Sequence, residues 1–188
     1  PMITGRHSLS EGIAPFEHMA DRSNFTVKEM FINDYRERNF SIMIASVYEG
    51  FDKMVVKEIP TPEVDDDSIL VRVRSCAVCG SDIRIFHSGN SRVNPPQTLG
   101  HEAAGEVAAV GKNVTKFKVG DRVAIGADVP CGECAFCEAG IGNNCQINYA
   151  MGYQFAGSFA EYLAGGETAP VSEPILFMVL PFLPQALG

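Results

Sequence analysis

The stretch Cys131-Gly-Glu-Cys134-Ala-Phe-Cys137, closed by Cys145, carries four thiols at the spacing C-x2-C-x2-C-x7-C. Thiolates this close in sequence can converge on one tetrahedral ion, and a closed four-sulfur shell is the usual form of a structural zinc site. Reduced cysteines in a loop and a pair of disulfides are the alternatives, but paired short spacings favour zinc. The stretch therefore predicts a metal-organised loop that supports a fold and does no chemistry itself.

The composition of the 188-residue chain is that of an ordinary globular protein with one core, at 46% hydrophobic and 20% charged residues. Its formal net charge of −8 argues against a nucleic-acid or anionic-membrane surface, since both need basic patches. The longest apolar stretch, residues 175–183, is interrupted by Pro181 and is too short to span a bilayer. The first residues show no signal pattern and the cysteines are metal-spaced, so we expect a cytoplasmic protein.

Short strand-like segments separated by glycine and proline turns dominate the chain before the four cysteines. The clearest is residues 68–75, which alternate between apolar and polar side chains as a half-buried strand does. Little helical pattern separates these segments, which favours a mainly β fold, a barrel or sandwich, over a parallel sheet. The segments that we expect as strands are residues 42–48, 53–59, 68–75, 103–110 and 122–125.

Residues 1–40 have a different pattern from the rest of the chain. A helix is expected across residues 9–20, with Ser8 or Ser10 as its cap and Pro15 early in it, where proline is best tolerated. A strand is expected over residues 25–32, and the polar residues 33–39 are expected to form a linker.

A second group of metal-binding residue types precedes the four cysteines. Cys79 and Ser81 follow directly on the strand at residues 68–75, and His101 and Glu102 come later from another element. A mixed ligand set of this kind suits a catalytic zinc, which keeps one position open. The Ser81 hydroxyl could pass a proton, and Asp82 could orient a ligand through a hydrogen bond. Cys79 and His101 as plain core residues remain the alternative on spacing alone.

These residues together resemble the zinc-containing medium-chain alcohol and polyol dehydrogenases. The resemblance covers Ile42 to about Leu163 and implies a GroES-like, partly open β barrel with a few short helices, which carries the substrate site. Its motifs are Cys79-Gly80-Ser81-Asp82, Gly100-His101-Glu102-Ala103-Ala104-Gly105-Glu106-Val107, Val110-Gly111, Lys118-Val119-Gly120-Asp121-Arg122-Val123, the four-cysteine loop, and Gly157-Ser158-Phe159-Ala160-Glu161-Tyr162.

The resemblance also implies a site and a reaction. Cys79 and His101 would ligate a catalytic zinc, Glu102 would lie beside the metal and could replace its water ligand, and Ser81 would match the proton-relay hydroxyl. With the four-cysteine loop, two zinc sites are expected. In intact relatives zinc acts as a Lewis acid on a small-molecule alcohol, while hydride passes to NAD(P) held by a separate Rossmann domain.

Three features depart from the family. No G-x-G-x-x-G loop follows a strand, so we expect no Rossmann domain in these residues. Residues 1–33 resemble the family's C-terminal end placed first. A circularly permuted domain and a read-through of two genes both explain this order. We favour the permuted domain because domain termini often lie close together. Glu173, in a Glu-Pro pair, is a weak candidate for a further zinc ligand, with a solvent-facing glutamate as the alternative.

The sequence therefore predicts three parts. Residues 1–40 are the segment that resembles the family's C-terminal end, residues 41–165 are a GroES-like zinc-binding catalytic domain, and residues 166–188 are a proline-rich apolar tail. We expect little or no alcohol oxidation by the chain alone, because nothing holds the hydride acceptor near the metal. A non-enzymatic GroES-like zinc-binding module, a fragment or an engineered fold is the alternative. The tail would cover exposed surface or join chains into a homo-oligomer.

Overall fold

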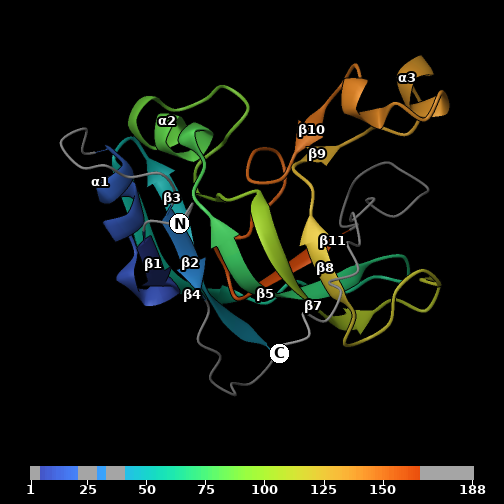
Figure 1. Ribbon diagram of the computed structural model, residues 1–188, viewed down its shortest axis with the longest axis horizontal. Helices are drawn as coiled ribbons and strands as arrows, with labels where there is room; N and C mark the ends of the chain where they lie inside the picture. The colour runs from blue at the N-terminus through green and yellow to red at the C-terminus, as the bar shows by residue number, and fades with distance from the viewer. Residues whose placement is uncertain (1–4, 21–28, 33–40, 166–188) are drawn as a thin grey trace, which may run out of the picture.

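The computed structural model describes residues 5–20, 29–32 and 41–165 (Figure 1). Strands dominate these residues and the α-helices among them are short, so the predicted mainly β fold is confirmed. None of the described helices is long and apolar enough to cross a membrane. Outside the described residues lie residues 25–28, the expected linker at 33–39, Glu173 and the apolar stretch at 175–183.

The larger sheet has β5 at its centre. One edge of β5 pairs antiparallel with β7, which pairs with β8 in the same sense. The other edge is shared, since β11 pairs with the first half of β5 and β2 with its last residues. β1 extends the sheet beyond β2 through parallel pairing. The strands are β1 (Gly5–Ser8), β2 (Glu29–Ile32), β5 (Ile69–Ala77), β7 (Glu102–Val110), β8 (Arg122–Ile125) and β11 (Tyr162–Gly165).

A second sheet lies against the first and is tied to it through residues 159–161. Its strand order is β4-β3-β6. The Ser46 N–H of β3 donates to the Phe159 carbonyl at 2.8 Å, and the Val73 N–H of β5 donates to the Glu161 carbonyl at 2.9 Å. One segment bonded to both sheets closes part of the space between them, as a partly open barrel requires. The strands are β3 (Ile42–Gly50), β4 (Lys53–Pro60) and β6 (Gln97–Thr98).

The alternation that identified β5 in the sequence reflects one mostly buried face, and the start of the strand is buried on its other face as well. Val71 and Val73 are 0% and 1% exposed and lie in the main core. Leu70 points to the opposite face, where it packs in a smaller cluster with Met43 and Tyr162. Because successive side chains of a strand alternate between faces, the central strand contributes to both clusters.

The N-terminal segment packs into the main core rather than beside it. The ring of Phe16 on α1 (Ala14–Ala20) is fully buried. Its centroid lies 5.5 Å from that of Phe86 on α2 (Gly80–Ser88) and 5.6 Å from that of Phe159. Phe31 of β2 lies 5.1 Å from Phe159. Figure 1 shows α1 and α2 on the same side of the sheets. The correspondence of this segment to the family's C-terminal end stays a prediction.

Two local features differ from the sequence prediction. The single helix expected across residues 9–20 is two shorter pieces, because Gly12, at φ 63°, ends the 3-10 turn η1 (Leu9–Glu11) before α1 begins. The Ser8 N–H donates to Glu11 Oε2 at 3.1 Å, as expected of a residue that starts a helical turn. The helix α2 was not predicted, although it carries Ser81 and Asp82.

Candidate metal centres

The four cysteines lie in a loop whose two ends are held together by a short ladder. β9 (Asp128–Val129) precedes the loop and β10 (Tyr149–Ala150) follows it, and the two pair antiparallel. Between them α3 (Ala135–Glu138) and the 3-10 turn η2 (Gly142–Asn144) fold the chain back on itself. In Figure 1 this loop stands away from the two sheets, on the side opposite α1. The loop can therefore form a site from its own residues alone.

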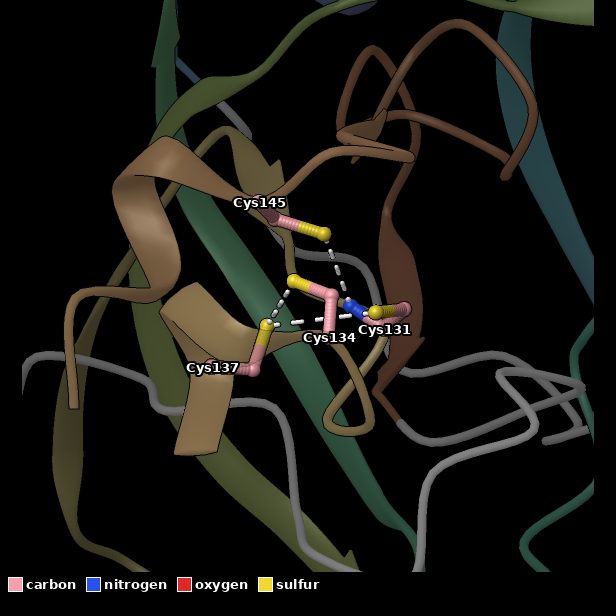
Figure 2. Close-up of side chains that lie close together, drawn as sticks. All are labelled: Cys131, Cys134, Cys137 and Cys145. Atoms are coloured by element: carbon pink, nitrogen blue, oxygen red, sulfur yellow. Dashed lines mark hydrogen bonds between the residues drawn. The ribbon is translucent and has the colours of Figure 1, made fainter. Parts of the chain in front are cut away.

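The four sulfur atoms of this loop converge on one point (Figure 2). All four lie within 4.8 Å of one another. The Sγ of Cys137 is 3.9 Å from that of Cys131 and 3.5 Å from that of Cys134. Four sulfurs bound tetrahedrally at about 2.3 Å from zinc would lie about 3.8 Å apart. The spacing thus fits a single zinc ion, and it is too long for a disulfide, in which the sulfurs lie about 2.05 Å apart.

Backbone N–H groups surround these sulfurs and favour the thiolate form. The N–H groups of Asn148 and Cys131 donate to Cys145 Sγ at 3.3 and 3.2 Å, and they lower the pKa of that thiol to about 6. The backbone N–H groups of Gln146 and Cys137 lower the pKa of Cys134 in the same way. Burial raises the pKa of Cys137 to about 12. A dication at the centre is the group that would hold all four thiolates together.

The second cluster forms where β5 ends and β7 begins. The last residue of β5, Ala77, pairs with the first residue of β7, Glu102. Cys79 stands two residues beyond that pair on one chain segment, and His101 stands one residue before it on the other. One ligand atom each from Cys79, His101 and Glu102 lies within 4.8 Å of the others. The sheet register therefore brings together ligand types that are far apart in sequence.

Asp82 is the buried residue behind this cluster. Its side chain is 1% exposed, and its Oδ2 accepts a hydrogen bond from the Cys79 N–H at 2.8 Å, which caps the start of α2. Its Oδ1 lies 3.5 Å from His101 Nδ1, and neither of these two atoms has a hydrogen-bond partner among the described residues. The carboxylate raises the pKa of His101 to about 9, chiefly through this contact. Metal-binding histidines commonly turn their second nitrogen to a carboxylate in this way.

The other predicted site residues lie around the same cluster. Ser81 is half-buried, and its Oγ lies 3.4 Å from His101 Nε2, the ring nitrogen on the side away from Asp82. Glu102 is exposed at the start of β7. Glu173 lies outside the described residues. The donor set fits a zinc ion that retains an open position. It consists of a thiolate, an imidazole and a carboxylate, with a hydroxyl nearby.

Two residues near this cluster were missed by sequence reasoning. The ring of Tyr153 lies 6.2 Å from that of His101, and the guanidinium carbon of Arg92 lies 5.3 Å from the Tyr153 ring centroid. Neither residue belongs to a motif with a recognisable spacing, so only the fold reveals their position.

Comparison with known proteins places this geometry in a family. The model of the alcohol dehydrogenase GroES-like domain matches residues 65–173, more than half of the chain. An L-threonine 3-dehydrogenase of Caldanaerobacter subterraneus is 40% identical over 118 residues, which are 61% of this chain and 33% of that protein. A sorbitol dehydrogenase of Bacillus subtilis is 38% identical over 125 residues, 64% of this chain and 35% of the relative.

Solved structures agree with the sequence matches. A galactitol-1-phosphate dehydrogenase from Escherichia coli superposes with a TM-score of 0.61 at 33% identity, over 65% of this chain and 35% of that one. The chain thus spans about a third of the length of the relatives that it matches. With its barrel and its ordered motifs, the chain belongs to the alcohol dehydrogenase GroES-like domain family, that of the zinc-type alcohol and polyol dehydrogenases.

Proposed function

We propose that residues 41–165 are the zinc-binding catalytic domain of a dehydrogenase that oxidises a CH–OH group, with NAD(P) as the hydride acceptor of the intact enzyme. The observation that carries this proposal is the buried Asp82 carboxylate against His101 Nδ1, since this contact leaves Nε2 as the ring nitrogen that would bind a metal together with Cys79 and Glu102. The matched relatives are named for threonine, sorbitol and galactitol-1-phosphate, which are different hydroxyl compounds. The feature that these substrates share is a CH–OH group, and it is the bond that we propose for oxidation.

Each residue of the cluster has a proposed role. Cys79 and His101 would hold the zinc ion, with Glu102 beside it as the ligand that exchanges with water. A zinc ion bound there supplies Lewis-acid polarisation of a hydroxyl oxygen. Asp82 keeps the imidazole in one orientation and offsets positive charge at the site. Ser81, whose Oγ lies 3.4 Å from His101 Nε2, would accept the proton of the substrate hydroxyl and pass it towards solvent.

The four-cysteine loop is proposed as a separate, structural zinc site. Cys131, Cys134, Cys137 and Cys145 use all four positions of a tetrahedral ion, so no position remains for a substrate. The loop is self-contained between β9 and β10. Loss of its zinc would loosen this loop without removing the chemical site.

These 188 residues alone are proposed to bind zinc and to oxidise alcohols slowly or not at all. No strand–glycine-rich loop–helix unit of the dinucleotide-binding type occurs in the described part of the chain. A hydride acceptor that is not held near the alcohol loses the rate advantage of a positioned reaction partner. Residues 1–40 are proposed to correspond to the family's C-terminal segment, and residues 166–188 to form a proline-rich apolar tail that covers exposed surface or joins chains into an oligomer.

Metal content tests the proposal most directly. The purified chain, prepared without chelator, is expected to hold two zinc ions, and Cys79→Ala is expected to hold one. A second zinc that survives Cys79→Ala, or a wild-type chain with one zinc held by the four-cysteine loop, would contradict the catalytic site. The latter result would favour the alternative, a non-enzymatic zinc-binding module. The match covers 33% of the length of the L-threonine 3-dehydrogenase. Rapid NAD(P)-dependent alcohol oxidation would contradict the proposed low activity.

A further inference from the structure

Tyr153 connects the Cys79–His101–Glu102 cluster to an arginine that no motif identified. Its ring centroid lies 6.2 Å from that of His101, with the two planes tilted by 56°. The Cζ atom of Arg92 lies 5.3 Å from the Tyr153 ring centroid, within the range of a cation–π contact. Two ring contacts therefore lead from the proposed zinc ligand to a guanidinium group.

The backbone holds Tyr153 in this position. Gln97 Nε2 donates hydrogen bonds to the carbonyls of Tyr153 and Phe155, at 2.7 and 3.3 Å. The Tyr153 N–H donates to the Ala150 carbonyl at 3.3 Å. The ring is half-buried and packs against the main core. Because Gln97 lies on β6, shortly before His101, the ring and the imidazole are positioned by the same stretch of structure.

The side chain of Arg92 makes its hydrogen bonds to neutral groups, whereas several other cations of the described residues, such as Lys57 and Lys118, lie against carboxylates. Its Nη2 donates to the Asn148 carbonyl and lies 3.4 Å from Gln154 Oε1. No carboxylate among the described residues lies within ion-pair distance of it, whereas Arg74, for example, lies 3.2 Å from Glu106. All of its side-chain hydrogen bonds to described residues use Nη2. The Nε and Nη1 groups thus keep N–H donors for another acceptor, and none of the described carboxylates pairs with the positive charge.

We propose that Arg92, supported by Tyr153, determines specificity by binding an oxyanion of the substrate while the substrate hydroxyl lies at the Cys79–His101–Glu102 cluster. The guanidinium fork matches the two oxygens of a carboxylate or a phosphate. The substrate class is therefore a hydroxy compound that also carries a carboxylate or phosphate group. This inference rests on the proposed dehydrogenase function and narrows its substrate.

Binding to the zinc-loaded full chain tests the inference without turnover. The probes are 3-hydroxybutyrate and glycerol 3-phosphate, compared with their uncharged counterparts 1,3-butanediol and glycerol, in NMR titrations. One added charge-assisted contact at the exposed Arg92 corresponds to a dissociation constant about 1.5- to fivefold lower for the anion. Arg92→Gln is expected to remove this advantage and to leave the uncharged compounds unchanged. Whichever anion keeps the larger advantage identifies the group as carboxylate or phosphate.

Two further variants separate recognition from structure. Arg74→Gln removes an exposed arginine elsewhere on the barrel and is the matched control, expected to keep the anion preference. Arg92→Lys keeps the charge without the fork, so it is expected to restore part of the preference. Equal binding of the charged and uncharged compounds by the wild-type chain, or an anion preference that survives Arg92→Gln, would overturn the inference.

Different experimental results would contradict the inference about Arg92 and the proposed dehydrogenase function. If the chain takes up no second zinc and acetate still shifts the Arg92 Nε–H signal, the dehydrogenase site is wrong and the anion site is retained. If the second zinc is present and neither anion is preferred, the dehydrogenase site is retained and the role of Arg92 is wrong.

Discussion

Ala77, at the end of β5, pairs with Glu102, at the start of β7, in the antiparallel register of the larger sheet. This register determines the position of the proposed zinc site, because Cys79 and His101 leave the two strands immediately beside that pair. A shift of one residue would turn each side chain to the other face of its strand. The buried residues of β5 and β7, which include Val71, Val73 and Val107, oppose such a shift.

The first prediction concerns Asp82. Asp82→Asn keeps the shape and an acceptor for the Cys79 N–H but removes the charge behind His101. The affinity of the Cys79–His101–Glu102 cluster for zinc is expected to fall about 10- to 100-fold, the usual effect of losing such a carboxylate. Chelator competition measures the affinity. Asp121→Asn, which alters a half-buried carboxylate that accepts the Lys118 N–H, is the control and should leave both zinc sites unchanged.

The second prediction concerns the N-terminal segment. Phe16 is fully buried among the rings of Phe31, Phe86 and Phe159, so Phe16→Ala leaves a cavity. We expect the free energy of unfolding to fall by about 3–5 kcal/mol, measured by urea denaturation. Phe51→Ala, at a ring that is 68% exposed, should change it by less than about 0.5 kcal/mol. If the two variants lose equal stability, the N-terminal segment does not belong to the core.

The third prediction concerns the four-cysteine loop. Cys145→Ser is expected to remove one zinc ion per chain and to speed amide hydrogen exchange across residues 131–147, while β5 and β7 stay protected. Cys76→Ala changes a buried thiol that belongs to neither cluster and should keep the full zinc content. Loss of protection across the whole barrel in Cys145→Ser would show that the loop supports more than itself.

The fourth prediction concerns Gly157, where the chain passes close to the residues that precede His101. A Cβ atom at Gly157 would clash with the backbone of Leu99 and Gly100, and backbone atoms cannot move aside cheaply. Gly157→Ala is expected to lower the free energy of unfolding by about 1–3 kcal/mol and to weaken zinc binding at the Cys79–His101–Glu102 cluster.

Gly126→Ala is the matched glycine control, since its Cβ would meet no atom within 4 Å. It should leave stability and zinc affinity nearly unchanged. If Gly157→Ala binds zinc as tightly as the wild-type chain, the approach of its backbone to Gly100 does not position His101.

Local features of the fold could be predicted because their causes are local. The strand expected over residues 122–125 is β8 with the same bounds, and the alternation over residues 68–75 corresponds closely to β5. Helix α2 was missed because its first residue is a glycine and its N-cap is Cys79, a residue that is uncommon at that position. Asp82 instead accepts the hydrogen bond of the Cys79 N–H at the start of the helix, whereas the sequence predicted for Asp82 only a role in orienting a ligand.

The sequence by itself determined the composition of the two donor sets. The four thiols of the loop meet through a few turns of chain, so their spacing alone indicated a common centre. Tertiary structure alone decided that Tyr153 lies against His101, that Arg92 lies over Tyr153, and that Phe16 is buried beside Phe159. These contacts join residues far apart in the chain, and their positions depend on strand register and on packing of the core, which no local spacing encodes.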